Sequence, residues 1–252
     1  MSILTLHQTP YQQTIFCYDD FIYKYSIQQN RLWEEHLVDT ILFYLQPNTD
    51  FLDIGANIGL ITLGVHLKAK QKQLSIQNTH CFECDTNNFN LLRNNTSHLH
   101  NIQLYPFAIS NQYELCHMTQ CSHNVGGNFI YKTVNQQQET KYIHQVGEFV
   151  KGASYITNLF LPAMSLDSIL YQFKNKISVI KIDVEGFECN VISGAIQLIQ
   201  LHRPVLLIEI WPKNLEQITS LLHQLNYHRI QKIRPNDQYD DNYISVPDEY
   251  TS

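Results

Sequence analysis

The sequence predicts an α/β fold, in which a mostly parallel sheet carries helices on both faces. Strand and helix patterns alternate from about residue 30 onward, and this alternation is typical of a doubly wound sheet. A glycine-containing turn, DIGANIG, stands where the first strand should pass into the first helix. The chain has 252 residues, which is enough for one large domain of this kind, or at most two small ones.

The first strand and helix of the sheet are predicted within residues 51–67. Before them, apolar residues recur at helical spacing over 32–45 and stop before Pro47. Residues 51–54 then form a short buried strand, and residues 58–67 form a helix after the glycine turn. We therefore expect residues 1–50 to be a cap segment of helix and strand, and residues 51–252 to be the domain that contains the sheet.

The later elements repeat the pattern of a strand followed by a helix. Strands are predicted at 79–83, 102–109, 177–182 and 204–210, and helices at 88–95, 189–201 and 215–225. The final segments YHRIQKI and NYISVP are expected to be two strands, joined by the polar loop RPNDQYDD.

The stretch of about residues 111–165, between the third and fourth strands, has poor helical periodicity. A structureless loop of that length is uncommon inside a compact domain and usually carries function. We therefore expect a strand-rich insertion that covers the carboxyl edge of the sheet.

Composition and charge restrict the class of protein. Lys and Arg number 17 against 23 Asp and Glu, which gives 17 − 23 = −6 and argues against nucleic acid as the main partner. No apolar run approaches the roughly 18 residues that would span a bilayer. The start, MSILTLHQTPYQQ, has no basic stretch followed by an apolar core, so we expect a cytoplasmic protein without a membrane span. The six cysteines are then expected to be reduced.

The segment DIGANIG, Asp53 to Gly59, predicts a ligand site at the carboxyl end of the first strand. Gly55 and Gly59 permit a tight backbone, and the helix amino terminus behind them favours a negative group. A nicotinamide fingerprint would need a second glycine where Asn57 stands, which weakens the dinucleotide interpretation. Glu83 ends the second strand, where a carboxylate can accept both hydroxyls of a ribose; the alternative is an exposed acid at a strand end.

The segment VIKIDVEGFE places acids directly after a buried strand. The apolar run is broken only by Lys181 and ends in Asp183, Glu185 and Glu188. In an open α/β sheet, ligands bind outside the carboxyl ends of the strands, where Asp183 is expected. For Glu188 we prefer a structural interpretation, near the amino end of a helix. Lys181 is interpreted as a partner charge within the strand or as an edge residue with its ammonium group in solvent, and contact with the substrate is the alternative.

Taken together, these segments resemble the FkbM family of S-adenosylmethionine-dependent methyltransferases over about residues 31–250. The resemblance is carried by DIGANIGLITL, HCFECDTNNFNLLRNN, FAIS, SLDSIL, RPVLLIEI and above all IKIDVEGFECNVISGA. It implies a class I methyltransferase fold, a Rossmann-like sheet of seven strands, and methylation of a hydroxyl on a sugar or a polyketide.

The resemblance also implies which residues hold S-adenosylmethionine. Glu83 would bind the ribose, and the backbone of Ala108 and Ile109 would lie against the adenine. Cys84 stands where the family commonly has Pro, and we include it among the cofactor-binding residues. The methionine part would be held by residues of the first turn, namely Asp53, Gly55, Ala56, Asn57 and Gly59.

Asp183 is the first candidate for a catalytic base, because an alcohol is a poor nucleophile while it keeps its proton. Glu185 is the second candidate, either orienting the substrate or sharing a divalent ion with Asp183 and Glu209. Oxygen ligands of this kind suit Mg²⁺, and the need for a metal stays open. His123 and His144, both in the insertion, are auxiliary candidates, although loop histidines commonly face solvent.

Cysteine spacing offers a competing interpretation. Cys81 and Cys84 match half of a zinc site, and CHMTQCSH places two cysteines and two histidines close together. Cys81 lies inside a predicted strand, however, and free cysteines are among the most buried residue types. We therefore favour reduced cysteines in the core.

The expected function is an O-methyltransferase that acts on a hydroxyl of a sugar, in a glycan or a glycosylated metabolite. The alternatives are methylation of a polyketide or lipid hydroxyl, and a partner subunit that binds S-adenosylmethionine without catalysis. The aromatic stretch FCYDDFIYKY is consistent with a homodimer, and core packing explains it equally well.

Overall fold

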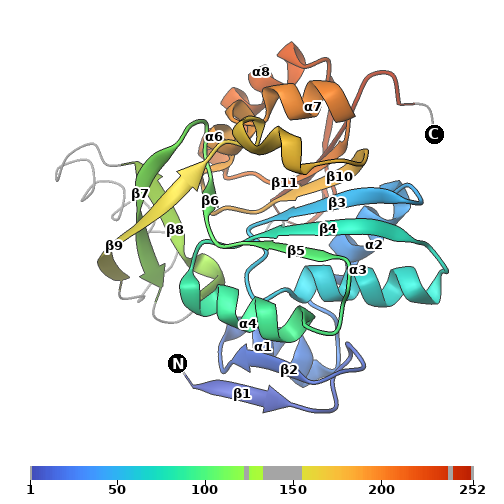
Figure 1. Ribbon diagram of the computed structural model, residues 1–252, viewed down its shortest axis with the longest axis vertical. Helices are drawn as coiled ribbons and strands as arrows, with labels where there is room; N and C mark the ends of the chain where they lie inside the picture. The colour runs from blue at the N-terminus through green and yellow to red at the C-terminus, as the bar shows by residue number, and fades with distance from the viewer. Residues whose placement is uncertain (1, 122–124, 133–154, 238–240, 251–252) are drawn as a thin grey trace.

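The computed structural model describes residues 2–121, 125–132, 155–237 and 241–250. Its central sheet has seven strands: β3 (Thr49–Ile54), β4 (Ile76–Phe82), β5 (Ile102–Tyr105), β10 (Ile177–Ile182), β11 (Val205–Glu209), β12 (Arg229–Lys232) and β13 (Asn242–Val246). They lie in the order β12-β13-β11-β10-β3-β4-β5 (Figure 1). All pairs are parallel except the two that involve β13. The predicted α/β class and the seven-stranded, mostly parallel sheet are confirmed.

Helices cover both faces of this sheet (Figure 1). They are α2 (Glu35–Tyr44), α3 (Leu60–Gln71), α4 (Thr86–Thr96), α6 (Glu188–Ser193), α7 (Ile196–His202) and α8 (Leu215–Gln224). One core joins the sheet to α6, α7 and α8, and another joins it to α2 and α3. Every residue of β3 and β10 is buried, which explains why both strands read as almost continuous apolar runs.

The single helix predicted at 189–201 is in fact two, α6 and α7, with a break at Gly194 and Ala195. A Cβ atom on Gly194 would lie 1.9 Å from the backbone oxygen of Ser110. The chain after the third strand therefore passes directly against the break. A contact across more than eighty residues of sequence leaves no periodic signal, so the prediction was wrong here.

The single strand predicted at 102–109 is also two. Pro106, which has no backbone N–H to donate, follows β5, and β6 (Ala108–Ile109) leaves the central sheet to pair with β9 (Tyr155–Met164). Together with β7 (Glu114–Cys121) and β8 (Phe129–Lys132), these strands form a second sheet in the order β6-β9-β7-β8. The insertion is thus strand-rich, as expected, and includes the end of the third predicted strand.

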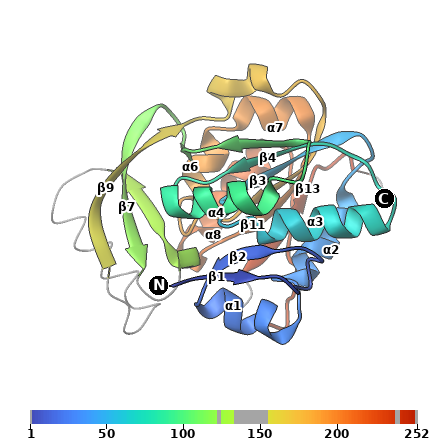
Figure 2. The same cartoon turned by 60° about the horizontal axis from the view of Figure 1, so that its bottom comes forward.

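The cap segment contains the hairpin β1 (Ile3–Leu6) and β2 (Ile15–Tyr18), followed by α1 (Phe21–Tyr25). Figure 2 shows the hairpin alongside α3 and α4. The Asn95 side chain on α4 accepts a hydrogen bond from the Phe16 N–H (2.8 Å) and donates to the oxygens of Phe16 (3.0 Å) and Ile58 (2.8 Å). The cap is therefore fixed to the helix that follows β4 and to the first glycine turn.

Core packing accounts for part of the aromatic stretch FCYDDFIYKY. Cys17, Tyr18 and Ile22 are buried against the sheet domain, whereas Phe21 and Tyr25 remain exposed.

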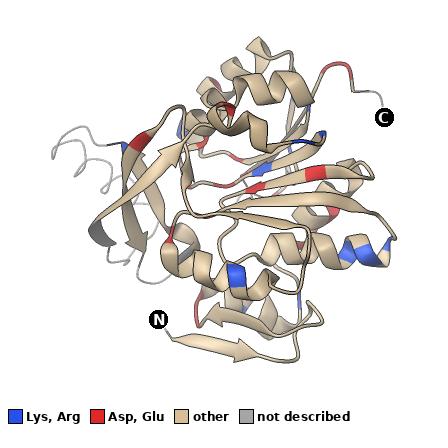
Figure 3. Cartoon of the chain, in the orientation of Figure 1, with Lys and Arg blue, Asp and Glu red and all other residues tan. Residues whose placement is uncertain are grey.

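Charged residues are spread over many elements, and Lys and Arg occur on α3, α4, β8 and β10 (Figure 3). Among the described residues, no helix combines the length and the apolar character needed to cross a membrane.

A buried hydrogen-bond network joins β3, β4 and β5. The Asp50 carboxylate contacts His80 Nε2 (3.1 Å) and accepts from the side-chain amides of Asn78 (3.1 Å) and Asn175 (3.1 Å). His80 Nδ1 also contacts the Tyr105 hydroxyl (3.1 Å). Burial opposes ionisation of Asp50, but the hydrogen bonds from His80 and the asparagines outweigh it and lower the pKa of Asp50.

We expect Asp50→Ala to lower the free energy of unfolding by about 2 to 3 kcal/mol at neutral pH, because it leaves buried donors without an acceptor. Urea unfolding followed by circular dichroism measures this change. Because the pKa is lowered on folding, the contribution is present above about pH 4, the unfolded value, and is lost as pH falls below it. Asp19→Ala is the control, since Asp19 forms an exposed pair with Lys24 and should change stability by less than about 1 kcal/mol. Equal effects of the two variants would contradict the role of the network.

Candidate active site

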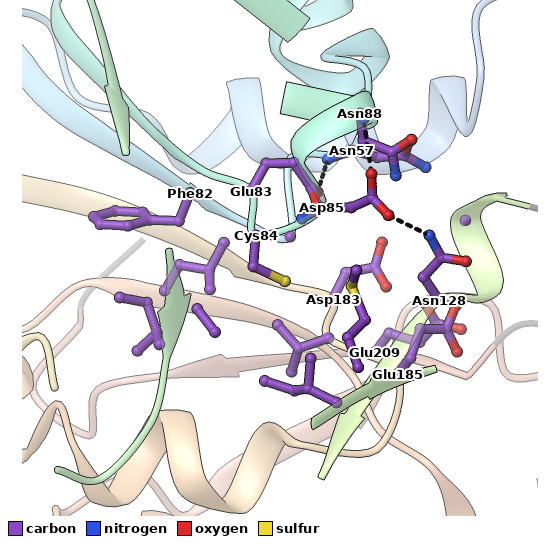
Figure 4. Close-up of a pocket in the computed structure, with 18 of the residues that line it drawn as sticks. Asn57, Phe82, Glu83, Cys84, Asp85, Asn88, Asn128, Asp183, Glu185 and Glu209 are labelled. Atoms are coloured by element: carbon purple, nitrogen blue, oxygen red, sulfur yellow. Dashed lines mark hydrogen bonds between the residues drawn. The ribbon is translucent and has the colours of Figure 1, made fainter. Parts of the chain in front are cut away.

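A cavity of about 330 Å³ lies at the carboxyl ends of β3, β4, β10 and β11. Figure 4 shows how side chains from both sheets converge on it. The cap closes one side with Phe21, Ile22, Trp33 and Glu34, and the second sheet supplies Ala108, Ile109, Met118, Asn128 and Ile130. From the central sheet come Ile54, Gly55, Asn57, Phe82, Glu83, Cys84, Asp85, Asn88, Asp183, Val184, Glu185 and Glu209.

The turn from β3 to α3 forms the floor of the cavity. Gly55, Asn57 and Gly59 all have positive φ angles, of 76°, 50° and 90°. A Cβ atom on Gly55 would lie 1.8 Å from the backbone oxygen of Asp183, so this turn and the turn after β10 meet backbone to backbone. The side-chain oxygen of Asn57 is buried and has no hydrogen-bond partner in the part of the chain that the structure describes. The turn thus presents an unsatisfied acceptor beside the cavity.

Glu83 lies on the β4 side of the cavity. Its two carboxylate oxygens accept hydrogen bonds from the backbone N–H groups of Asn57 (2.8 Å) and Asp85 (2.7 Å). Burial raises the pKa of Glu83 to about 7, against the effect of these two bonds. Each oxygen retains a lone pair, so Glu83 in its ionised form can accept hydroxyl groups of a ligand.

Asp85 connects the two sheets at the cavity. One carboxylate oxygen caps α4 by accepting from the N–H groups of Asn87 (2.7 Å) and Asn88 (3.1 Å). The other accepts from the side-chain amide of Asn128 (3.1 Å) in the insertion (Figure 4). Sequence reasoning missed Asp85, although an Asp before the helical stretch TNNFNLL is a recognisable N-cap signal.

Lys181 is the internal counter-charge of the site. Its ammonium nitrogen lies 3.2 Å from Asp53 Oδ1 and 3.2 Å from Asp183 Oδ2, and donates to the oxygen of Gly55 at 2.9 Å. Burial alone would lower the pKa of Lys181, but Asp183 and Asp53 outweigh it and raise the pKa above its ordinary value. The positive charge is therefore permanent, and the structure supports the interpretation of Lys181 as a partner charge within the strand.

Asp183 has two acidic neighbours in the cavity, Glu185 and Glu209 (Figure 4). The negative charge of Asp183 and burial raise the pKa of Glu209 well above its usual range, and the two side chains share a hydrogen bond. Burial, followed by the charges of Asp183 and Glu188, does the same for the pKa of Glu185. The cluster therefore combines Asp183, which contacts the Lys181 ammonium, with two carboxyl groups whose pKa values are raised by burial and by their acidic neighbours.

A family model described as the methyltransferase FkbM domain matches residues 53–229. The chain belongs to the FkbM methyltransferase family. Among solved structures, a methyltransferase FkbM from Methylobacillus flagellatus KT is similar with a TM-score of 0.53 and 15% identity, over 80% of this chain and 44% of that one. The chain thus spans less than half the length of that protein. A comparison with curated proteins gives no match.

Two further solved structures are similar at lower scores. One is a precorrin-6y C5,15-methyltransferase from Geobacter metallireducens GS-15, with a TM-score of 0.42 and 10% identity over 85% of this chain and 86% of that one. The other is an rRNA methylase from Streptococcus thermophilus, with a TM-score of 0.45 and 9% identity over 83% and 91%.

In this member of the FkbM methyltransferase family, the residues predicted to hold a cofactor divide into two groups. Those that line the cavity are Gly55, Asn57, Glu83, Cys84, Ala108 and Ile109. Asp53, Ala56 and Gly59 lie outside its lining: Asp53 accepts from the Thr62 hydroxyl (2.6 Å) and pairs with Lys181. The cofactor-binding role of these three residues stays a prediction.

Of the predicted catalytic residues, Asp183 and Glu185 line the cavity, whereas His123, like His144, lies outside the described residues. Glu188 is buried and holds the turn after β10, because it accepts from the N–H of Gly186 (2.7 Å) and the side-chain amide of Asn214 (2.7 Å). This geometry agrees with the structural interpretation of Glu188.

Among the described residues, the arrangement of possible ligands does not fit Mg²⁺ or zinc. In the ranges that the structure describes, no group of three or more His, Cys, Asp and Glu side chains could hold a metal ion. The Lys181 ammonium already supplies the positive charge between Asp53 and Asp183. Cys81, Cys116 and Cys121 are buried within strands as free thiols, as the reduced-core interpretation predicts.

The sequence did not predict that two cap residues, Trp33 and Glu34, line the cavity. Trp33 was assigned only to the apolar stripe of a helix, and Glu34 has a left-handed backbone (φ 43°) just before α2. Nothing local in the sequence indicates that this segment reaches the carboxyl edge of the sheet.

Proposed function

We propose that this FkbM methyltransferase binds S-adenosylmethionine in the cavity and transfers its methyl group to a hydroxyl of a sugar, in a glycan or a glycosylated metabolite. The observation that carries the proposal is the Asp183 carboxylate, held by the buried Lys181 ammonium at a cavity whose opposite side carries Glu83. When bound, S-adenosylmethionine supplies an electrophilic methyl group.

The residues present fit this cofactor. The unsatisfied oxygen of Asn57 is an acceptor for the cofactor's amino group, and Gly55 leaves the floor of the cavity without a side chain. Glu83 is an acceptor for the ribose hydroxyls, and the apolar side chains of Phe82 and Ile109 offer a surface for the adenine. Polar and apolar walls are therefore arranged as a nucleoside with an amino-acid tail requires.

Within this proposal, Asp183 would accept the proton of the acceptor hydroxyl. Lys181 holds the carboxylate in place. Glu185 and Glu209, whose pKa values are raised by burial and by the charge of Asp183, would orient the other oxygens of the acceptor through hydrogen bonds. The second sheet and the cap limit the access of water to the cavity.

Titration calorimetry of Glu83→Ala with S-adenosylmethionine tests the cofactor site. We expect binding to weaken by about 1 to 3 kcal/mol, because the variant lacks the charge-assisted acceptor of two hydroxyls. Glu216→Ala is the control, since Glu216 is exposed on α8 and outside the cavity, and it should bind as the wild type does. An unchanged dissociation constant in Glu83→Ala would remove Glu83 from the site.

The pH dependence of the same titration gives a second readout. Because the pKa of Glu83 is raised to about 7, the ionised acceptor is depleted below that pH and predominates above it. Affinity of the wild type should therefore increase from pH 6 to pH 8, and the increase should be smaller in Glu83→Ala.

A further inference from the structure

The second sheet is connected to the central sheet at its β6 end. β7 begins beside this connection, because Glu114 pairs with the same residue of β9, Ala163, as Ala108 of β6 does. From Glu114 to its last residue β7 runs roughly 20 Å away from the connection. Met118 on β7 and its partner Ile130 on β8 line the cavity beyond the middle of this length. The cavity wall that they form therefore lies toward the far end of the second sheet.

Asp85 attaches this far end to α4. Its Oδ2 atom accepts hydrogen bonds from the side-chain amides of Gln120 (2.5 Å) on β7 and Asn128 (3.1 Å) just before β8 (Figure 4). The side-chain oxygen of Asn128 accepts from the backbone N–H of Cys121 (2.8 Å). That bond fixes the direction of the amide, so Asn128 presents its NH₂ group to Asp85.

Asp85 also contacts the proposed ribose acceptor. Its backbone N–H donates to Glu83 Oε1 (2.7 Å), and its Oδ1 atom caps α4 through the N–H groups of Asn87 and Asn88. The side chain is buried, and both of its oxygens accept two hydrogen bonds. One residue therefore connects Glu83, the start of α4 and the far end of the second sheet.

We propose that Asp85 is a positioning residue for S-adenosylmethionine, an inference that rests on the proposed function. Through Gln120 and Asn128 it holds the wall formed by Met118 and Ile130 against the cavity. Without these two hydrogen bonds the far end of the second sheet separates from α4 for part of the time. A site that is complete in only a fraction of the molecules binds its ligand more weakly by that fraction.

Asp85→Asn separates this role from helix capping. Asn is as good an N-cap as Asp, so the side-chain oxygen at position 85 still accepts from the N–H groups of α4. Its NH₂ group must then face the NH₂ group of Asn128, and two donors cannot form a hydrogen bond. We expect the dissociation constant for S-adenosylmethionine, measured by calorimetry, to rise about tenfold.

Asp85→Asn combined with Asn128→Asp restores the pair with donor and acceptor exchanged. The new carboxylate at position 128 can accept from the Cys121 N–H with one oxygen and from the new amide at position 85 with the other. The double variant should bind within about threefold of the wild type. Asn128→Asp alone places two carboxylates against each other and should weaken binding at least as much as Asp85→Asn does. A loss of packing alone would not be reversed by the exchange.

Asp167→Asn is the matched control. The two carboxylate oxygens of Asp167 accept from the N–H groups of Gln197 (3.0 Å) and Leu198 (2.9 Å) at the start of α7, so this variant also loses an acceptor. Asp167 lies outside the cavity lining, and the variant should bind as the wild type does. Gln120→Ala leaves Asp85 and its helix cap unchanged and should weaken binding about threefold; it tests the proposal even if variants at position 85 fail to fold.

Hydrogen exchange of the backbone N–H groups of residues 129–132, without ligand, tests the attachment separately from the cofactor. Exchange should be at least threefold faster in Asp85→Asn than in the wild type and should slow again in the double variant. Unchanged affinity in Asp85→Asn or Gln120→Ala, or no recovery in the double variant, would overturn the proposal while leaving the proposed function intact. Failure of the wild type to bind S-adenosylmethionine would defeat the proposed function, and unchanged exchange rates would show independently that Asp85 does not hold the second sheet.

Discussion

Replacement of Asp183 by Asn should lower turnover on the order of 10² to 10⁴ fold and leave the affinity for S-adenosylmethionine nearly unchanged. The substitution preserves the shape of the side chain and removes the proton acceptor. Asp183 is the acid that contacts the Lys181 ammonium in the cavity at 3.2 Å, whereas Glu185 and Glu209 have pKa values raised well above their usual range.

Turnover is measured as S-adenosylhomocysteine formed with a sugar acceptor, and affinity by calorimetry on the same preparations. Asp39→Asn serves as the control, because Asp39 is an exposed acid on α2 that pairs with Lys68, outside the cavity; its turnover should equal that of the wild type. Near-normal turnover of Asp183→Asn at saturating substrate would show that the acids of DVEGFE have a structural role instead of a catalytic one.

Because the arrangement of possible ligands among the described residues does not fit a metal ion, EDTA should leave the wild-type rate unchanged.

Gly55→Ala should lower the free energy of unfolding by about 2 to 5 kcal/mol. The positive φ of 76° is costly for any residue with a Cβ atom, by about 1 to 2 kcal/mol. The added Cβ would also lie 1.8 Å from the backbone oxygen of Asp183, and overpacking of this kind adds about 1 to 3 kcal/mol. Relief of the clash requires the turns after β3 and β10 to separate, so cofactor binding should fall as well.

Urea unfolding of Gly55→Ala and Gly64→Ala provides the comparison. Gly64 lies within α3, and a Cβ atom there would meet side-chain methyl groups, those of Val38 at 3.0 and 3.6 Å and one of Leu32 at 3.9 Å. A side-chain methyl can move, and alanine favours a helix over glycine, so Gly64→Ala should change stability by less than about 1 kcal/mol. Similar stability of the two variants would show that the approach of the turns is not tight.

The sequence by itself determined the central sheet and the edge at which the site lies. Strand β10 occupies the predicted residues 177–182, because a strand buried on both faces appears as a local apolar run. DIGANIG, Glu83 and DVEGFE each follow such a run, and the carboxyl ends of parallel strands meet at one edge. Their convergence therefore followed from local patterns and one rule of topology.

Only the tertiary structure decided which groups complete the site. The partners of Lys181, the link from Asp85 to Asn128 and the approach of Trp33 and Glu34 all join segments distant in the sequence. The same holds for the passage of β6 into the second sheet and for the helix break at Gly194. Periodicity and capping are local properties that one chain displays, whereas the choice of contact partners depends on how whole elements pack against one another.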